Sequence, residues 1–193
     1  MTFLQVMPEN APDRVLLRTR DETQIADALR ECAVQLRRWP ANDTVRPGAS
    51  AEEVLAHYRS AVDELCAQEN LRLVDVVQFH PEDTPAWREQ AAKARDTFLE
   101  EHRHGENEVR FFARGAGCFY LHVNQRVYAV VCEAGDLISV PAGTTHWFDM
   151  GPRPDFCAVR FFEQEDGWIG DFTGSDIAQR FPRLDDLPAG ISA

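Results

Sequence analysis

The sequence has 193 residues, of which 44% are hydrophobic and 27% are charged, a composition typical of one soluble globular domain. Its formal net charge of −12 argues against binding to nucleic acid or to an anionic membrane, because both require clustered lysine and arginine. The N-terminus lacks the basic and apolar regions of a signal peptide, and no run of about eighteen apolar residues occurs, so we expect a cytoplasmic protein without a membrane span.

Two helices are predicted in the first third of the chain. From Asp21 to Trp39, apolar residues recur at alternating steps of four and three, and Pro40 ends the pattern, which predicts a helix over about 21–39. Ser50 and Glu53 have the spacing of a capping box that opens a second helix over about 50–69. We expect both helices to pack on the outer face of a β-barrel.

The rest of the chain reads mainly as strands. The segment 71–79, LRLVDVVQF, is rich in β-branched residues, and Thr84 and Pro85 then suit the start of a short helix that runs to about Arg95. Beyond Phe98, apolar runs broken by turn residues recur roughly every 8–12 residues, which is typical of an antiparallel sandwich or barrel. We therefore expect a single domain, 1–193, whose barrel is built mainly from about 71–162.

The five cysteines are predicted to be reduced. No two of them have the Cys-x-x-Cys spacing of a zinc or redox site, and their number is odd. Each lies among apolar neighbours, which fits small core side chains better than a disulfide framework.

The segment 101–110, EHRHGENEVR, concentrates side chains that bind metals. On a strand, alternate residues share a face, so His102 and His104 would point the same way, and the following turn would bring Glu108 back opposite them. Arg110 has the parity of Glu108, and an arginine beside a metal suits a bound anion. Taken alone, the same pattern also fits a solvated hairpin with no ligand.

A second block, GDLISVPAGTTH, ends in a Pro-x-Gly turn that delivers another histidine onto a new strand. The patterns H-x-H-x3-E-x6-G, from His102 to Gly115, and G-x5-P-x-G-x2-H, from Gly135 to His146, resemble the two motifs of the cupin superfamily. The flanking segments EVRFF, DLISVPAGTTHWFDMG and GWI-x-x-FTG-x-DIA are similar to the acireductone dioxygenase family of methionine salvage, from about Phe98 onward. This resemblance implies a mainly β cupin fold, a double-stranded β-helix or jelly-roll barrel with flanking helices.

The resemblance also implies one metal ion per chain, bound by His102, His104, Glu108 and His146. Three imidazoles and one carboxylate fill four of the six positions of an octahedron and leave two for a chelating oxygen ligand. A fourth protein ligand favours Fe(II) or Ni(II), with Co(II) or Mn(II) as substitutes, over the three-ligand site of catalytic zinc.

The implied reaction joins O2 to 1,2-dihydroxy-3-keto-5-methylthiopentene. In this family the iron form yields formate and 4-methylthio-2-oxobutanoate, and the nickel form yields formate, CO and 3-methylthiopropanoate. Such an enzyme is an oxidoreductase that incorporates both oxygen atoms into a single donor, and we expect it to be a monomer. Arg110 would stabilise the substrate dianion and lower the second pKa of the substrate, a surface salt bridge being its alternative role.

Three aromatic residues are expected to form an apolar wall around the substrate. Phe98 shares strand parity with His102, and Phe148 shares it with His146, so both should face the metal. Trp168 is placed there by the resemblance alone, and core packing is the alternative role for all three.

The resemblance further suggests which residues orient the ligands. Glu101 and Arg160 would hold the imidazoles from behind. Asn107 is placed with them, although the family commonly has an aspartate there, so this chain carries no charge at that position. His122 falls outside both motifs, and we expect it to be a hydrogen-bonded histidine of the barrel rather than an additional ligand.

Two other functions fit the same motifs. A cupin could bind or isomerise a sugar or a small acid with this metal set and without O2 chemistry, or it could be a non-catalytic binding protein. The position of Arg110 and the segments WFDMG and GWI favour the dioxygenase by likeness. The complete ligand set argues against a non-catalytic protein, which need not preserve one.

Overall fold

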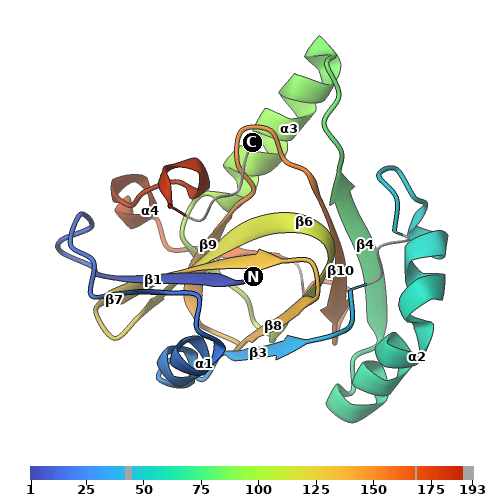
Figure 1. The fold of residues 1–193 in the computed structure, drawn as a ribbon, viewed down its shortest axis with the longest axis horizontal. Coiled ribbons are helices and arrows are strands. Elements are labelled where there is room, and N and C mark those ends of the chain that lie inside the picture. Colours follow the sequence, from blue (N-terminus) through green and yellow to red (C-terminus); the bar gives the residue numbers. More distant parts are fainter. Residues whose placement is uncertain (42–44, 168, 189–193) are drawn as a thin grey trace.

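The computed structural model describes residues 1–41, 45–167 and 169–188, and Figure 1 shows antiparallel strands that curve into a barrel with helices around it. The strands are β1 (Phe3–Pro8), β2 (Leu17–Thr19), β3 (Gln35–Arg38), β4 (Leu73–Phe79), β5 (His102–Arg103), β6 (Glu108–Val123), β7 (Arg126–Glu133), β8 (Asp136–Val140), β9 (Thr145–Asp149), β10 (Phe156–Phe162) and β11 (Asp171–Phe172). The helices are α1 (Glu22–Arg30), α2 (Ala51–Glu69), α3 (Pro85–Phe98) and α4 (Ile177–Arg180), followed by a 3-10 turn at Leu184–Asp186.

The barrel closes around the long strand β6. Its first part, from Glu108, pairs with β8 and β10, and its second part, from Ala116, pairs with β7 and β9. The strand orders are therefore β3-β8-β6-β10-β4 on one side and β11-β5-β9-β6-β7-β1-β2 on the other. Between the two parts stands Gly115 at φ +68°, where an added Cβ would lie 1.9 Å from the carbonyl oxygen of Asp155, so only glycine fits there.

Alternation along the strands sorts the apolar side chains into three layers. The barrel interior contains buried aromatic residues of β6, β9 and β10, which are Phe112, Phe119, Phe148 and Phe156. The outer face of the β8-β6-β10-β4 side is covered by the buried side of α2, as Figure 1 shows, and the outer face of the other side is covered by α4 and the residues after it. The predicted antiparallel barrel with flanking helices is confirmed. The expectation that the first helix packs on the outer face was wrong, because Ile25 and Leu29 of α1 belong to the same apolar cluster as the barrel interior.

The predicted first helix is shorter than expected. α1 ends at Arg30, and Ala33 at φ +56° turns the chain into β3, where Leu36 pairs with Ile138 of β8. The apolar spacing continues past the helix only because the turn and the strand each bury a residue at the same intervals, Cys32 in the turn and Leu36, in part, in the strand. An open edge on β8 gives these residues ladder hydrogen bonds, which a continued helix would leave unmade.

The second and third helices begin as expected. Ser50 and Glu53 form both hydrogen bonds of the capping box of α2, and Thr84 caps α3, which runs three residues beyond the expected end, to Phe98. The chain before α1, for which no strands were predicted, adds β1 beside β7. Within the described residues, no helix combines the length and the apolar composition that crossing a membrane requires.

A buried ion pair ties α3 to the barrel. The carboxylate of Asp149 is completely buried and accepts hydrogen bonds from Arg95 Nε at 2.8 Å, Arg95 Nη2 at 3.0 Å, and the backbone N–H groups of Gly151 and Leu184. Burial by itself would raise the pKa of Asp149, but the hydrogen bonds from Arg95 and the backbone outweigh it and lower the pKa.

Asp149→Asn is expected to lower the free energy of unfolding by about 3 kcal/mol at neutral pH, because it leaves Arg95 without its buried partner. Because the pKa of Asp149 is lower in the folded state, its ionised form stabilises the wild type above the unfolded-state pKa of about 4, and this contribution is lost as the pH falls below that value. Urea unfolding of both proteins should therefore show the difference narrowing toward pH 3. A constant difference across this range would exclude the ionised carboxylate as its cause.

Candidate metal centre

Three buried histidines converge at one end of the barrel. His102 on β5, His104 in the turn that follows and His146 on β9 each offer a ring nitrogen, and these nitrogens lie within 4.8 Å of one another. β5 and β9 pair at a single position, His102 opposite His146, which joins the two sequence motifs directly. His104 lies beyond the end of β5, so the turn rather than strand alternation brings it to the cluster.

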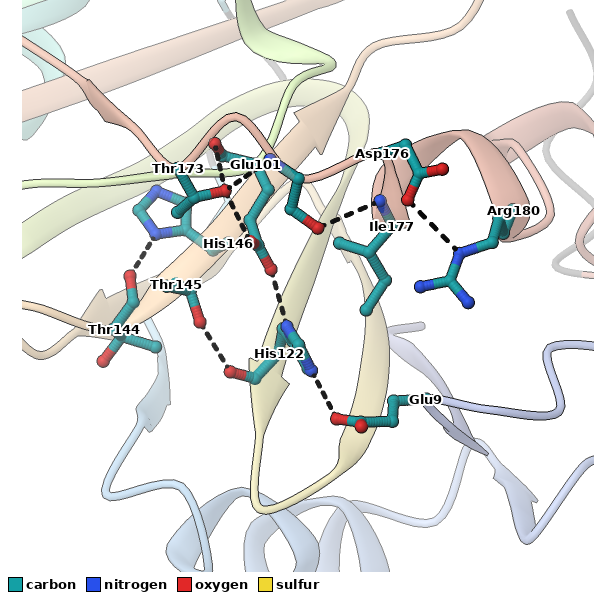
Figure 2. Close-up of polar contacts among 11 residues, drawn as sticks. Glu9, Glu101, His122, Thr144, Thr145, His146, Thr173, Asp176, Ile177 and Arg180 are labelled. Carbon is teal, nitrogen blue, oxygen red and sulfur yellow. Dashed lines mark hydrogen bonds and ion pairs between the residues drawn. The ribbon is translucent and has the colours of Figure 1, made fainter.

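The three imidazole rings are oriented in the same way, by a backbone carbonyl group. Each Nδ1 lies beside a backbone carbonyl oxygen, that of Glu100 for His102 at 2.7 Å, of Ile169 for His104 at 3.0 Å, and of Thr144 for His146 at 2.8 Å. Figure 2 shows the contact of His146 with Thr144. A carbonyl oxygen only accepts hydrogen bonds, so each Nδ1 carries the proton and each Nε2 presents its lone pair to the centre.

Glu108, the first residue of β6, lies next to two of the three histidines. Its Oε2 lies 2.7 Å from His146 Nε2 and 3.5 Å from His104 Nε2. Glu108 Oε2 and His146 Nε2 are both buried without a hydrogen-bond partner in the described structure. Two lone pairs at this distance repel each other unless a proton or a metal cation binds them, and two buried atoms without a hydrogen-bond partner fit the ligands of a divalent metal ion.

The pKa values of the cluster depend on its burial. Burial and the neighbouring His146 lower the pKa of His102 to about 4, so this ring is neutral at physiological pH, as a metal ligand must be. Burial alone would raise the pKa of Glu108, but Arg110 and the nearby histidines hold it well below its usual value. For His104, burial is outweighed by the hydrogen bond and charge of Glu108, which raise its pKa. Metal binding at His104 therefore competes with a proton.

Arg110 lies next to the cluster in an aromatic cage. Its Nη2 is 2.6 Å from Glu108 Oε1, and its guanidinium carbon lies 5.9, 5.3 and 5.1 Å from the ring centres of Phe98, Phe119 and Phe148. Burial lowers the pKa of Arg110 and the ion pair with Glu108 opposes that effect, and an arginine stays protonated at neutral pH. The structure thus excludes the alternative of a surface salt bridge.

The aromatic residues reach the site by routes that the sequence predicted only in part. Phe98 is the last residue of α3 and not part of a strand, so the parity argument for it was wrong, although its ring does lie by Arg110. Phe148 extends from β9 into the barrel as predicted. Trp168 lies outside the described residues. The sequence analysis did not identify Phe119. Its place beside Arg110 follows from the register of β6 with β9, in which Phe119 pairs with Phe148.

Two side chains that were expected to orient the imidazoles contact other residues instead. Glu101 is next to His102 but its carboxylate points away, binding His122 Nδ1 at 2.6 Å and Thr173 Oγ1 at 2.7 Å (Figure 2). Arg160 pairs with both carboxylate oxygens of Asp75 at 2.8 and 2.6 Å. The expectation that these two side chains hold the imidazoles was wrong, because backbone carbonyls already occupy each Nδ1.

Arg160 and Asn107 nevertheless contribute to the surroundings of the site. Arg160 stands opposite Arg110 in the pairing of β10 with β6, and its charge adds to the lowering of the pKa of Arg110. Asn107 Oδ1 accepts the N–H of Ala142 at 3.0 Å, which fastens the Pro-x-Gly turn of the second motif to the turn of the first. An amide oxygen serves this contact as well as a carboxylate, so no charge is needed at Asn107.

His122 lies outside the cluster, as expected. Its ring is held between Glu101 and Glu9, with Nε2 at 2.9 Å from Glu9 Oε2 (Figure 2). A cavity of about 880 Å³ lies elsewhere, beside the bend of β6 at Gly115, and none of the four candidate ligands lines it. The metal chemistry therefore belongs to the histidine cluster.

Known proteins share both the sequence and the fold. The model of the ARD/ARD' family matches residues 4–170. The chain is 59% identical to acireductone dioxygenase 1 of Nocardia farcinica over 188 residues, 97% of this chain and 99% of that protein. It is 57% identical to acireductone dioxygenase of Frankia alni over 187 residues, 97% and 91% of the two chains. An acireductone dioxygenase from Bacillus anthracis with a cadmium ion in its active centre superposes with a TM-score of 0.73 at 25% identity, covering 89% of this chain and 98% of that one.

Proposed function

Because the chain belongs to the ARD/ARD' family, we propose that it oxidises 1,2-dihydroxy-3-keto-5-methylthiopentene with O2 in methionine salvage. The relatives are dioxygenases, so the chain is an oxidoreductase, and its barrel is the cupin fold that the motifs implied. The predicted dioxygenase is thereby favoured over an isomerase or a binding protein.

The observation that carries the proposal is the meeting of three Nε2 lone pairs with a buried carboxylate. We assign His102, His104, Glu108 and His146 as the ligands of one metal ion per chain. When bound, the metal would supply Lewis acidity toward the enediolate and redox access to O2. Imidazole and carboxylate ligands suit both iron and nickel, so we propose that metal supply decides between the keto-acid products of the iron form and the CO-releasing products of the nickel form.

Arg110 has the binding role in this proposal. Its charge is buried next to Glu108, and the rings around it exclude water, so its attraction for a substrate anion is weakly screened. A cation in this position favours the doubly deprotonated enediol and lowers the second pKa of the substrate. The electron-rich dianion is the form that reacts with O2, and Arg110 would thus prepare the substrate for oxidation.

The surroundings suit a substrate with an apolar tail. Phe119 and Phe148 are fully packed around Arg110 inside the barrel, which leaves the tail to extend toward the surface. There Phe172 of β11 pairs with His102, with ring centres 5.5 Å apart, and is 49% exposed. An exposed aromatic ring beside one of the candidate ligands offers a contact for a methylthio group.

The activity can be tested with anaerobically prepared acireductone. We expect Fe(II)-loaded protein to accelerate the loss of the ultraviolet absorbance of the substrate when air is admitted, and the Ni(II)-loaded protein to release CO while the iron form does not. Metal-free protein is the control. No acceleration over buffer with either metal would overturn the proposal.

We also propose that the protein acts as a monomer. All four candidate ligands and Arg110 belong to one chain, so the site is complete without a partner. Light scattering behind size-exclusion chromatography should give a mass close to 21.9 kDa. A dimer mass would remove this part of the proposal.

A further inference from the structure

His104 differs from the other two histidines in the origin of the carbonyl that orients it. His102 and His146 bond to carbonyls two residues earlier in their own segments. His104 instead donates its Nδ1–H to the carbonyl of Ile169, which lies 65 residues further along the chain. Its orientation therefore depends on a distant segment, residues 163–167 and 169–173, which follows β10.

Two large apolar side chains in the described part of this segment are poorly packed. Ile169 is 56% exposed and Phe172 is 49% exposed. β11 adds only two residues to the edge of β5, and the ion pair between Arg103 and Asp171 is at the surface. Thr173 binds the buried Glu101 on one side of Ile169, and a buried contact on the other side would fix the carbonyl of Ile169 more firmly.

Glu106 supplies that contact from the turn that also carries His104. The residue is only 8% exposed, and its Oε2 accepts the backbone N–H groups of Glu163 at 3.0 Å and Gln164 at 3.1 Å. Its other oxygen, Oε1, is buried without a hydrogen-bond partner in the described structure and packs against Gly167. A Cβ at Gly167 would lie 1.3 Å from this oxygen, so any side chain at residue 167 would force the carboxylate of Glu106 to move.

We propose that Glu106 is a positioning residue for the metal centre. By fixing residues 163–167, it places the carbonyl of Ile169 where it holds His104 with Nδ1 protonated and Nε2 turned to the metal. A buried carboxylate oxygen without a hydrogen-bond partner lowers the stability of the folded state, and such a group in a native structure calls for a functional explanation. The inference rests on the proposed function in one respect, that His104 is a metal ligand.

Glu106→Ala is expected to weaken cobalt(II) binding by about tenfold, the low end of the loss seen when an outer partner of a ligand histidine is removed. Glu106→Gln should recover most of the affinity, because an amide oxygen also accepts two N–H groups. Glu165→Ala is the matched control, since it removes the same charge from an exposed position in the same segment. Affinity is measured by competition with a chelator, using cobalt absorption.

Gly167→Ala tests the same contact from its other side. The new methyl group should expel the carboxylate and reproduce the loss of Glu106→Ala, and the backbone of Gly167 lies outside the left-handed region, so alanine adds no strain of its own. In the double variant no carboxylate remains to clash, so the affinity should equal that of Glu106→Ala alone. Losses that simply add would show that Gly167→Ala acts elsewhere and would contradict the proposed contact.

A spectroscopic readout separates positioning from a general loss of structure. In metal-free protein labelled with ¹⁵N-histidine, Glu106→Ala should shift or broaden the Nδ1–H signal of His104 and leave those of His102 and His146 in place. Wild-type affinity together with an unchanged His104 signal in this variant would overturn the inference alone. Failure of the wild type to bind cobalt would overturn the metal centre, and the inference with it.

Discussion

Replacing His146 with alanine is expected to release most of the bound metal and to reduce dioxygenase turnover to the background rate. His146 is the ligand that links the second motif to the first, through its pairing with His102 and its 2.7 Å approach to Glu108. Its loss should weaken metal binding by more than the roughly 10–100-fold that follows removal of an outer partner. Elemental analysis after gel filtration measures the metal retained per chain.

A histidine outside the site provides the control for this experiment. His80 is half-exposed in the loop before α3, and its ring faces Asp155 rather than the cluster, so His80→Ala should keep both metal and turnover. Full metal occupancy in His146→Ala would mean that the four side chains do not form one site. The assignment of His102, His104 and Glu108 as ligands of the same metal ion would then be withdrawn.

Local sequence spacing, together with the resemblance to the two cupin motifs, identified the candidate ligands. His102, Glu108 and His146 lie at strand positions whose direction follows from alternation, and the Pro-x-Gly turn indicates where the second motif reverses. Arg110 follows from the same parity on β6. These features depend on neighbours a few residues away, and such neighbours are visible in a single sequence.

The surroundings of the site depend on register and backbone, which spacing does not determine. The resemblance placed Arg160 near the site, but only the pairing of β10 with β4 shows that the guanidinium of Arg160 pairs with Asp75. The carbonyl of Ile169 that orients His104 leaves no trace in residue type, because every residue has a carbonyl. The strand β3 was misread as helix for a related reason, since its partner β8 lies about a hundred residues away in the chain.

Arg110→Met is expected to keep the metal and to lower kcat by about 10²-fold, the loss that follows removal of one charge-stabilising group. Methionine fills much of the same space among Phe98, Phe119 and Phe148 without the charge, so the cage should not collapse. Without the cation, formation of the substrate dianion requires a higher pH. The deficit should therefore shrink as the pH rises, and a pH series of kcat with Fe(II)-loaded protein measures it.

Arg110→Lys separates the charge from the geometry of the guanidinium. Lysine keeps a cation beside Glu108 but loses the planar fork, so its rate should fall between those of the wild type and Arg110→Met, with a pH profile near that of the wild type. If Arg110→Met instead lost metal in proportion to activity, the arginine would act by fixing Glu108 as a ligand. A deficit that stays constant with pH while the metal is retained would show that Arg110 positions the substrate without promoting its deprotonation.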